Sequence, residues 1–131
     1  MTPADFRRLA LSLAGAEEGS HHGVADFRVG GHIFATLASA DEGLGNLVLD
    51  RDEQAILVDE LPGVFFAIKG GWGRMGMTHV RLAAVDEEVL LGALQTAFRI
   101  RERKNARARK KAPVPARRPP KSPRPRRPRA K

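Results

Sequence analysis

The segment from Asp26 to Leu37 constrains the fold of this chain most, because it carries the pattern of a β-hairpin. The Gly30-Gly31 pair separates two runs rich in β-branched and aromatic residues, and a two-residue turn of the primed type needs positive φ angles, which glycine adopts without steric cost. Apolar side chains alternate on both arms, so one face of the hairpin is expected to be buried. Phe34 breaks this alternation, so its ring is expected either to be covered by another element or to be exposed for binding.

Further helices and strands are expected on both sides of the hairpin. Thr2 and Asp86 are predicted helix N-caps, and Asp50 with Glu53 forms a variant of the capping box. The segments 16–25 and 69–76 lack a helical or strand period and are expected to be loops. The predicted helices cover residues 3–14, 52–60 and 86–99, and the predicted strands beyond the hairpin cover residues 46–50, 64–68 and 77–83.

These elements predict a two-layer α+β fold. An antiparallel sheet of about five strands would pack against about three helices, whose apolar stripes cover one face of the sheet. The folded domain is expected to span residues 1–99, and residues 100–131 are expected to be a disordered Lys/Arg/Pro-rich tail. The last helix can continue into the start of this tail, where its cationic end would suit the helix dipole.

Charge is divided sharply along the chain. Residues 1–98 contain 7 Lys and Arg against 14 Asp and Glu, a net charge of −7, whereas residues 99–131 contain 16 Lys and Arg and one acid, a net charge of +15. Phosphate groups would therefore attract only the C-terminal segment. The sequence indicates an acidic globular body followed by a cationic segment.

The C-terminal segment is the strongest chemical signal in the sequence. Seven prolines beyond Ala112 prevent helix formation and keep the charges extended, as in the tails of linker-histone-like proteins. Such a segment binds nucleic acid electrostatically and without sequence preference. The alternative is a solvated segment that raises solubility or contacts ribosomes and acidic partners. The expected nucleic-acid-binding residues of the segment are Arg101, Arg103, Lys104, Arg107, Arg109, Lys110, Lys111, Arg117, Arg118, Lys121, Arg124, Arg126, Arg127 and Arg129.

The body offers one candidate surface of its own. Trp72 could stack on a base, while Arg28, Arg74 and Arg81 could contact phosphate. The alternative interpretation is the more common case in small domains. It makes the single tryptophan a core residue and the arginines solvated side chains on the outer face of strands.

The composition narrows the chemistry open to the protein. Without cysteine, disulfides, thiolate catalysis and cysteine-ligated zinc are excluded, and the cytoplasm, including the nucleoid, is the expected location. No targeting segment or membrane partner is expected, because no apolar run approaches the roughly 20 residues that span a bilayer. Four histidines lie near acidic residues, but no His-x-x-x-His pair falls on a predicted helix, so neither a metal site nor a cofactor is expected.

Three segments together resemble the MmcQ/YjbR-like family. They are Asp26-Phe27-Arg28-Val29-Gly30-Gly31, Ile33-Phe34-Ala35 and Gly71-Trp72-Gly73, and they occur within an order of helix, three strands, helix, strands and helix over residues 1–99. The resemblance implies a compact two-layer α+β fold with an antiparallel sheet, of the type described as a double-wing DNA-binding fold. It implies no general enzymatic activity.

The hypothesis that joins these observations is a non-enzymatic protein that binds DNA, or RNA, chiefly through its basic segment. The alternative is a protein-interaction adaptor or a small-molecule-binding domain that the segment localises. An enzyme is the third hypothesis, and it requires a deep pocket that gathers Glu18, His22 and Arg28.

Overall fold

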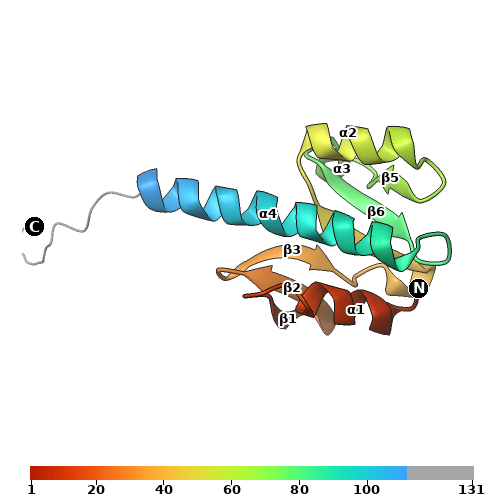
Figure 1. Cartoon of the computed structure of the whole chain (residues 1–131), viewed down its shortest axis with the longest axis horizontal. Helices are drawn as coiled ribbons and strands as arrows, with labels where there is room; N and C mark the ends of the chain where they lie inside the picture. Colours follow the sequence, from red (N-terminus) through yellow and green to blue (C-terminus); the bar gives the residue numbers. More distant parts are fainter. Residues whose placement is uncertain (112–131) are drawn as a thin grey trace, which may run out of the picture.

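A six-stranded antiparallel sheet forms one layer of the fold, and helices cover one of its faces (Figure 1). The protein is seen here as a computed structural model, which describes residues 1–111. Within these residues the strands lie in the order β1-β2-β3-β4-β6-β5. The strands are β1 (Glu17–His21), β2 (Val24–Val29), β3 (His32–Thr36), β4 (Leu44–Val48), β5 (Phe65–Ala67) and β6 (Met77–Arg81). The helices are α1 (Pro3–Leu11), the 3-10 turn η1 (Ala40–Glu42), α2 (Arg51–Glu60), α3 (Gly71–Arg74) and α4 (Glu87–Lys111).

The predicted fold class, a two-layer α+β fold with an antiparallel sheet, is confirmed. Residues 1–111 contain one strand and one α-helix more than the sequence predicts. The additional strand, β1, lies in the segment 16–25, for which the sequence predicts a loop. The additional helix, α3, is a single turn within the glycine-rich segment 69–76.

β1 forms through backbone pairing rather than through an apolar pattern. It pairs with β2 along its whole length, and a tight turn at His22 and Gly23, with φ angles of 52° and 76°, joins the two strands. Two positive φ angles in succession match a primed hairpin turn. Most side chains of β1 are exposed, so no hydrophobic period marks this strand in the sequence.

A β-bulge explains why Phe34 breaks the alternation of the hairpin. The register between β2 and β3 shifts by one residue, from Phe27 opposite Ala35 to Arg28 opposite Ile33, which leaves one extra residue in β3 at Phe34. Phe34 and Ala35 are both fully buried. The Phe34 ring packs edge-on against a phenylalanine of α4, with 5.3 Å between ring centroids. This ring therefore belongs to the core and not to a binding surface.

The helices begin at the predicted capping residues. Thr2 forms a capping box with Asp5 at the start of α1. Asp50 accepts a hydrogen bond from the backbone N–H of the third residue of α2, and Asp86 caps α4 in the same way. Each carboxylate or hydroxyl satisfies a backbone donor that the first helical turn leaves unpaired.

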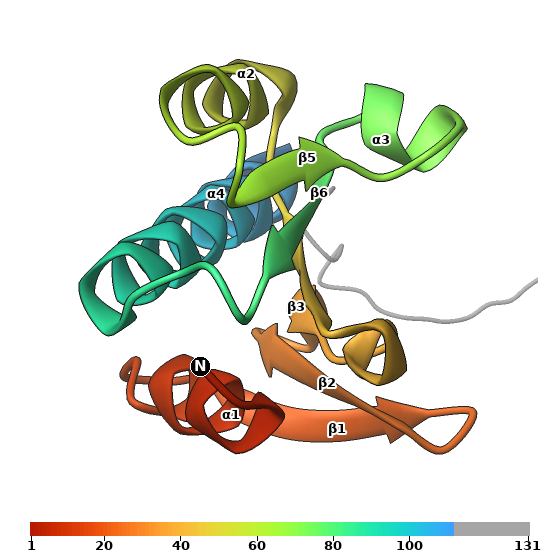
Figure 2. The same cartoon turned by 90° about the vertical axis from the view of Figure 1, so that its right-hand side faces the viewer.

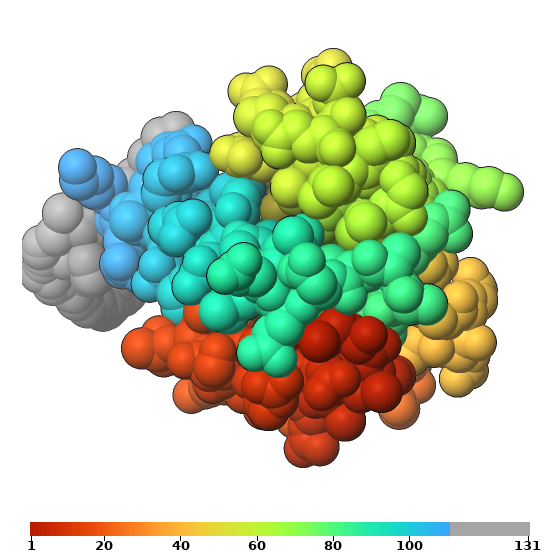
Figure 3. Space-filling model, turned by 45° about the vertical axis from the view of Figure 1, so that its right-hand side comes forward, coloured from red at the N-terminus to blue at the C-terminus, as the bar shows by residue number. Residues whose placement is uncertain are grey.

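The core lies between the sheet and the helices α1 and α4. Figure 2 shows α1 and α4 on the same side of the sheet, and in Figure 3 α4 fills the band between α1 and α2. We call the opposite side of the sheet the outer face; η1 and α3 flank it at its margins. The fully buried core side chains include Phe6, Phe27, Phe34, Leu47, Phe65, Val80, Leu90 and Leu94.

α4 remains docked on the body beyond the predicted domain boundary at residue 99. Ile100 and Asn105 are buried, and Asn105 Nδ2 donates a 3.0 Å hydrogen bond to the carbonyl oxygen of Val29 at the hairpin tip. Gly30, with φ of 60°, permits this approach, because a Cβ there would lie 2.6 Å from Asn105 Nδ2. Residues 100–111 are helical, in line with the expected continuation of the last helix, although the predicted domain boundary places them in the disordered tail. The rest of the predicted disordered tail lies outside the described residues.

Candidate functional site

Polar side chains form a straight row across the outer face of the sheet. Strand register places Asp26 of β2 opposite Thr36 of β3, Thr36 opposite Asn46 of β4, and Asn46 opposite His79 of β6. We call these four residues the polar row. The first three are buried, which is unusual for side chains on a sheet face that no helix of residues 1–111 covers. Each of them must therefore find a hydrogen-bond partner within the fold.

Asp26 is a fully buried carboxylate at one end of the polar row. It accepts hydrogen bonds from Arg28 Nε at 2.7 Å and Arg28 Nη2 at 3.1 Å, and its Oδ2 lies 2.7 Å from His21 Nδ1. The Arg28 hydrogen bonds hold the pKa of Asp26 below its usual range, although burial opposes them. Gly19 makes room for the ion pair, because a Cβ there would lie 2.9 Å from both Arg28 Nε and Asp26 Oδ1. Arg28, a predicted nucleic-acid contact, is thus held in an internal ion pair.

The other end of the polar row fixes the proton position on His79. Asn46 Nδ2 donates to Thr36 Oγ1 at 3.1 Å and to Ser39 Oγ at 3.3 Å, so Asn46 Oδ1 is the acceptor that lies 2.7 Å from His79 Nδ1. In this orientation of the Asn46 amide, His79 Nδ1 carries the proton, and Nε2 of the neutral ring is a hydrogen-bond acceptor. Burial lowers the pKa of His79 more than nearby Glu42 raises it, and Arg81 lowers it further, so the neutral ring is favoured at pH 7.

A groove of about 620 Å³ lies over this end of the polar row. It runs between η1 and α3, on the side of the sheet that is turned away from α1 and α4 (Figure 2). Its apolar wall consists of Ile33, Val48, Ile68, Trp72 and Met77. Its polar lining consists of His21, Thr36, Ser39, Glu42, Asn46 and His79.

The sequence does not reveal the polar row as a set. Thr36, Asn46 and His79 stand in three different strands, and their only shared signal is a polar residue on the same face of each strand. That signal appears only when the register between strands is known, and the bulge at Phe34 conceals the register.

Trp72 is exposed, so the interpretation of this tryptophan as a core residue is wrong. Its residue surface is 65% accessible, and the indole lines the groove from α3. Arg81 also lies on the outer face, where its guanidinium carbon is 4.4 Å from the centroid of the Phe66 ring. Arg74 is exposed at the end of α3 and lines a separate groove beside α2. The structure therefore does not gather Trp72 with Arg28, Arg74 and Arg81 into one site.

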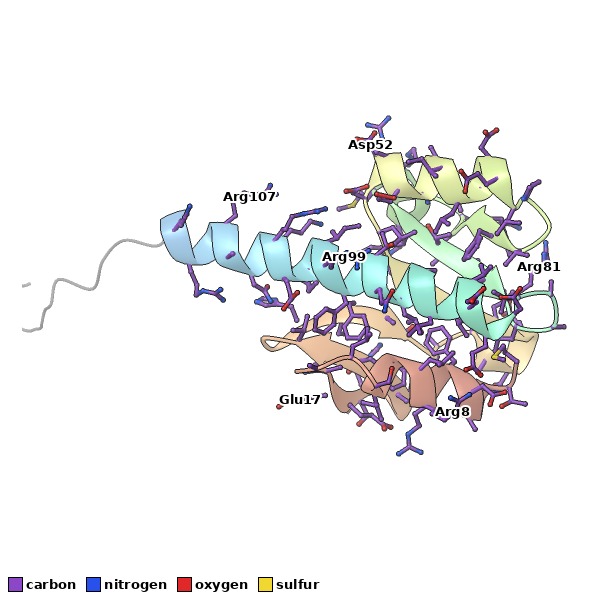
Figure 4. The ribbon with its side chains drawn as sticks, viewed as in Figure 1. Arg8, Glu17, Asp52, Arg81, Arg99 and Arg107 are labelled. Atoms are coloured by element: carbon purple, nitrogen blue, oxygen red, sulfur yellow. The ribbon has the colours of Figure 1, made fainter. Side chains whose placement is uncertain are left out.

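The C-terminal part of α4 forms a second candidate surface, which we call the basic helix end (residues 99–110). It projects past the sheet in Figure 1, and Figure 4 shows Arg107 directed away from the sheet. No cation of the basic helix end lies within 4.0 Å of a carboxylate among the described side chains. Its exposed cations are Arg99, Arg103, Lys104, Arg107, Arg109 and Lys110, and Arg101 is partly exposed.

The remaining predicted nucleic-acid contacts fall at the end of the described chain or beyond it. Lys111 closes α4. Outside the described residues lie Arg117, Arg118, Lys121, Arg124, Arg126, Arg127 and Arg129.

The residues considered for catalysis are separated by the sheet. Glu18 forms a 2.6 Å ion pair with Arg7 on the helical side, whereas Arg28 binds Asp26 on the outer face. His22 lies in the turn between β1 and β2. Within residues 1–111, no three His, Asp or Glu side chains are grouped so that they could hold a metal ion. No helix of that range has the length and apolar character needed to cross a membrane.

Comparisons with known proteins agree with the fold. In the crystal structure of Deinococcus radiodurans protein DR2400, which has a DUF419 domain, a similar fold covers 86% of that chain and 83% of this one, with a TM-score of 0.65 and 18% sequence identity. A search of curated proteins finds no match. The family model described as YjbR matches residues 11–100, from the end of α1 into α4, and so spans more than half of the chain. The resemblance predicted from the hairpin and the tryptophan segment is thereby confirmed, and the chain belongs to the YjbR family.

Proposed function

We propose that the protein is a non-enzymatic nucleic-acid-binding protein, with duplex DNA as its main partner. The contacts come from the basic helix end and from the basic residues that follow it. The observation that supports this proposal most is the row of exposed cations on the basic helix end, none of which has a carboxylate partner among the described side chains. Such cations are free to replace the counterions of phosphate groups.

The charge of the body determines how the complex would be oriented. Residues 1–98 carry a net charge of −7, so DNA would be repelled by most of the body surface and attracted to the projecting end of α4. This mode of binding reads phosphate and not base sequence. Its affinity falls with salt by about 0.9 log units per log unit of salt for each phosphate neutralised.

A pair of matched double variants tests the proposal. Replacing Arg103 and Arg107 by Gln removes two exposed cations from the basic helix end, and replacing Arg51 and Lys69 by Gln removes two exposed cations from the body. Binding of each full-length variant to a fluorescent DNA duplex is measured by anisotropy over a salt series. We expect the first variant to bind more weakly, with a salt slope smaller by about 1 to 2, because two phosphate contacts are lost.

The control variant is expected to keep the wild-type affinity and salt slope. Equal losses in the two variants would contradict the proposal, since they would show that total charge and not the basic helix end governs binding. The same titration with RNA distinguishes a DNA preference from general attraction to phosphate.

A further inference from the structure

The α3 wall of the groove on the outer face is held in place by hydrogen bonds and close backbone packing. Gln54 Nε2 of α2 donates hydrogen bonds to the carbonyl oxygens of Gly73 and Met77 and to Thr78 Oγ1. These contacts fasten α3 to α2 and β6. Gly73 packs its backbone so closely on the Ile68 carbonyl that no Cβ could fit there. Gly73 is therefore on the side of α3 that packs against the protein. The Trp72 indole, in the same helical turn, faces the groove.

Two polar groups in the groove, His79 Nε2 and the Glu42 carboxylate, are hydrogen-bond acceptors for which no partner is found among the described side chains. Both Nδ2 donors of Asn46 are used by Thr36 and Ser39, and its Oδ1 accepts from His79 Nδ1. His79 Nε2 remains as an acceptor because Nδ1 carries the proton. Glu42 of η1 contributes an exposed carboxylate to the same groove. A ligand that complements these groups must bring N–H donors.

The charge of the groove disfavours one class of ligand. The residues that line it include no lysine or arginine, and Glu42 is its only acidic residue. The nearby Asp26 carboxylate is compensated by Arg28. A lining with one carboxylate and no cation favours a neutral or cationic ligand over an anionic ligand such as a phosphate ester, although Arg81 lies nearby on the same face.

We propose that this groove binds a small, planar nitrogen heterocycle that carries an amino group, of the chemical class of a free nucleobase such as adenine. The ring packs between the Trp72 indole and the other residues of the apolar wall, and an N–H group donates to His79 Nε2 or to Glu42. The groove is lined by residues of η1 and α3, which Figure 2 shows on the opposite side of the sheet from α4, so this binding is separate from the proposed contacts with DNA.

Trp72 supplies the signal for a direct titration. It is the only tryptophan of a chain that has no tyrosine, so indole fluorescence reports on this groove alone. We expect adenine to change the emission of the full-length protein saturably. N6,N6-dimethyladenine, which lacks the amino donor, is expected to bind about tenfold more weakly, as for one lost hydrogen bond. AMP is also expected to bind more weakly than adenine, because its phosphate is repelled by the Glu42 carboxylate.

Two matched pairs of variants locate the binding, measured by isothermal titration with adenine. Trp72→Ala is compared with Met75→Ala, since both residues are exposed, 65% and 68%, but Met75 lines a different groove beside α2. Glu42→Gln is compared with Glu60→Gln, which removes an equal charge at the exposed end of α2. We expect the Trp72 and Glu42 variants to bind adenine at least about tenfold more weakly and the two controls to bind as the wild type does.

Three outcomes would overturn the proposal. They are the absence of saturable binding of adenine, equal affinity of the Trp72→Ala variant and the wild type, and an indole emission that changes with protein concentration instead of with adenine. The last outcome would show that a second copy of the chain covers the groove.

Discussion

At the scale of single residues, the Asp26 carboxylate stabilises the sheet only while it is ionised. Its hydrogen bonds with Arg28 lower its pKa in the folded protein from the ordinary value of 3.8. A carboxyl group with a lowered pKa contributes stability that is fully present above the unfolded pKa and is lost as the pH falls through the folded pKa. The contribution of Asp26 is therefore constant at neutral pH and disappears in acid.

The Asp26→Asn variant tests this contribution. We expect its free energy of unfolding at pH 7 to fall by about 2 kcal/mol, because a buried charge-assisted hydrogen bond is lost while the partly exposed Arg28 can still reach water. In urea unfolding the difference from the wild type should shrink below pH 4. Asp41→Asn, an exposed change of the same chemistry, should alter stability by less than about 0.5 kcal/mol. An undiminished difference at pH 3 would refute the assignment.

Sequence reasoning succeeds for residues with local roles and fails where distant packing decides. Thr2, Asp50 and Asp86 cap helices as predicted, because a cap depends on backbone donors within three residues. Trp72 is exposed because the backbone of Gly73, one residue away, occupies the packed side of α3 against Ile68. A contact between two segments that approach only after folding leaves no local pattern in the sequence.

At the scale of elements, α4 has one part that the sequence predicts and one part that depends on a distant contact. The sequence predicts the start of α4 from the N-cap Asp86, and it predicts the apolar stripe of α4 from the helical spacing of the residues that follow. Its continuation to residue 111 depends partly on Asn105, which bonds to Val29, a residue 76 positions earlier in the chain. A basic segment without apolar periodicity gives no sign of such a contact, and β1, whose partner is a neighbouring backbone, is equally hidden.

The Asn105→Ala variant tests the docking of α4 on the hairpin. It removes the 3.0 Å hydrogen bond to Val29 and is expected to reduce the free energy of unfolding by about 1 kcal/mol. Amide hydrogen exchange should accelerate most in residues 101–111, since they lose the hydrogen bond that ties this part of α4 to the hairpin. Glu102→Ala, on the exposed side of the same helix, serves as the control and should leave the exchange rates at the hairpin tip unchanged.

At the scale of the whole molecule, the position of a truncation decides what it measures. A chain cut after residue 99 loses the buried Ile100 and Asn105, so reduced DNA binding would be mixed with damage to the body. A chain cut after Lys111 keeps every described element. It lowers the net charge of the segment that begins at residue 99 from +15 to +7.

We expect the protein that ends at Lys111 to keep the thermal stability of the full chain within about 1 kcal/mol and to bind DNA more weakly, with about half the salt slope. The remaining slope would come from the basic helix end. Calorimetry and anisotropy titrations of both chains provide the measurement. An unchanged slope would assign all binding to residues 1–111, and a slope of zero would remove the basic helix end from the proposed interface.

The two edges of the sheet have a consequence for the behaviour of the protein at high concentration. β1 exposes the side chains of Glu17 and Glu18 along one edge, and β5, at the other edge, has three residues with α2 packed beside it. Pairing of two copies through β1 would bring their Glu17 carboxylates to the same seam, and β5 offers too short a template for another strand. Concentrated solutions should therefore resist the growth of cross-β fibrils.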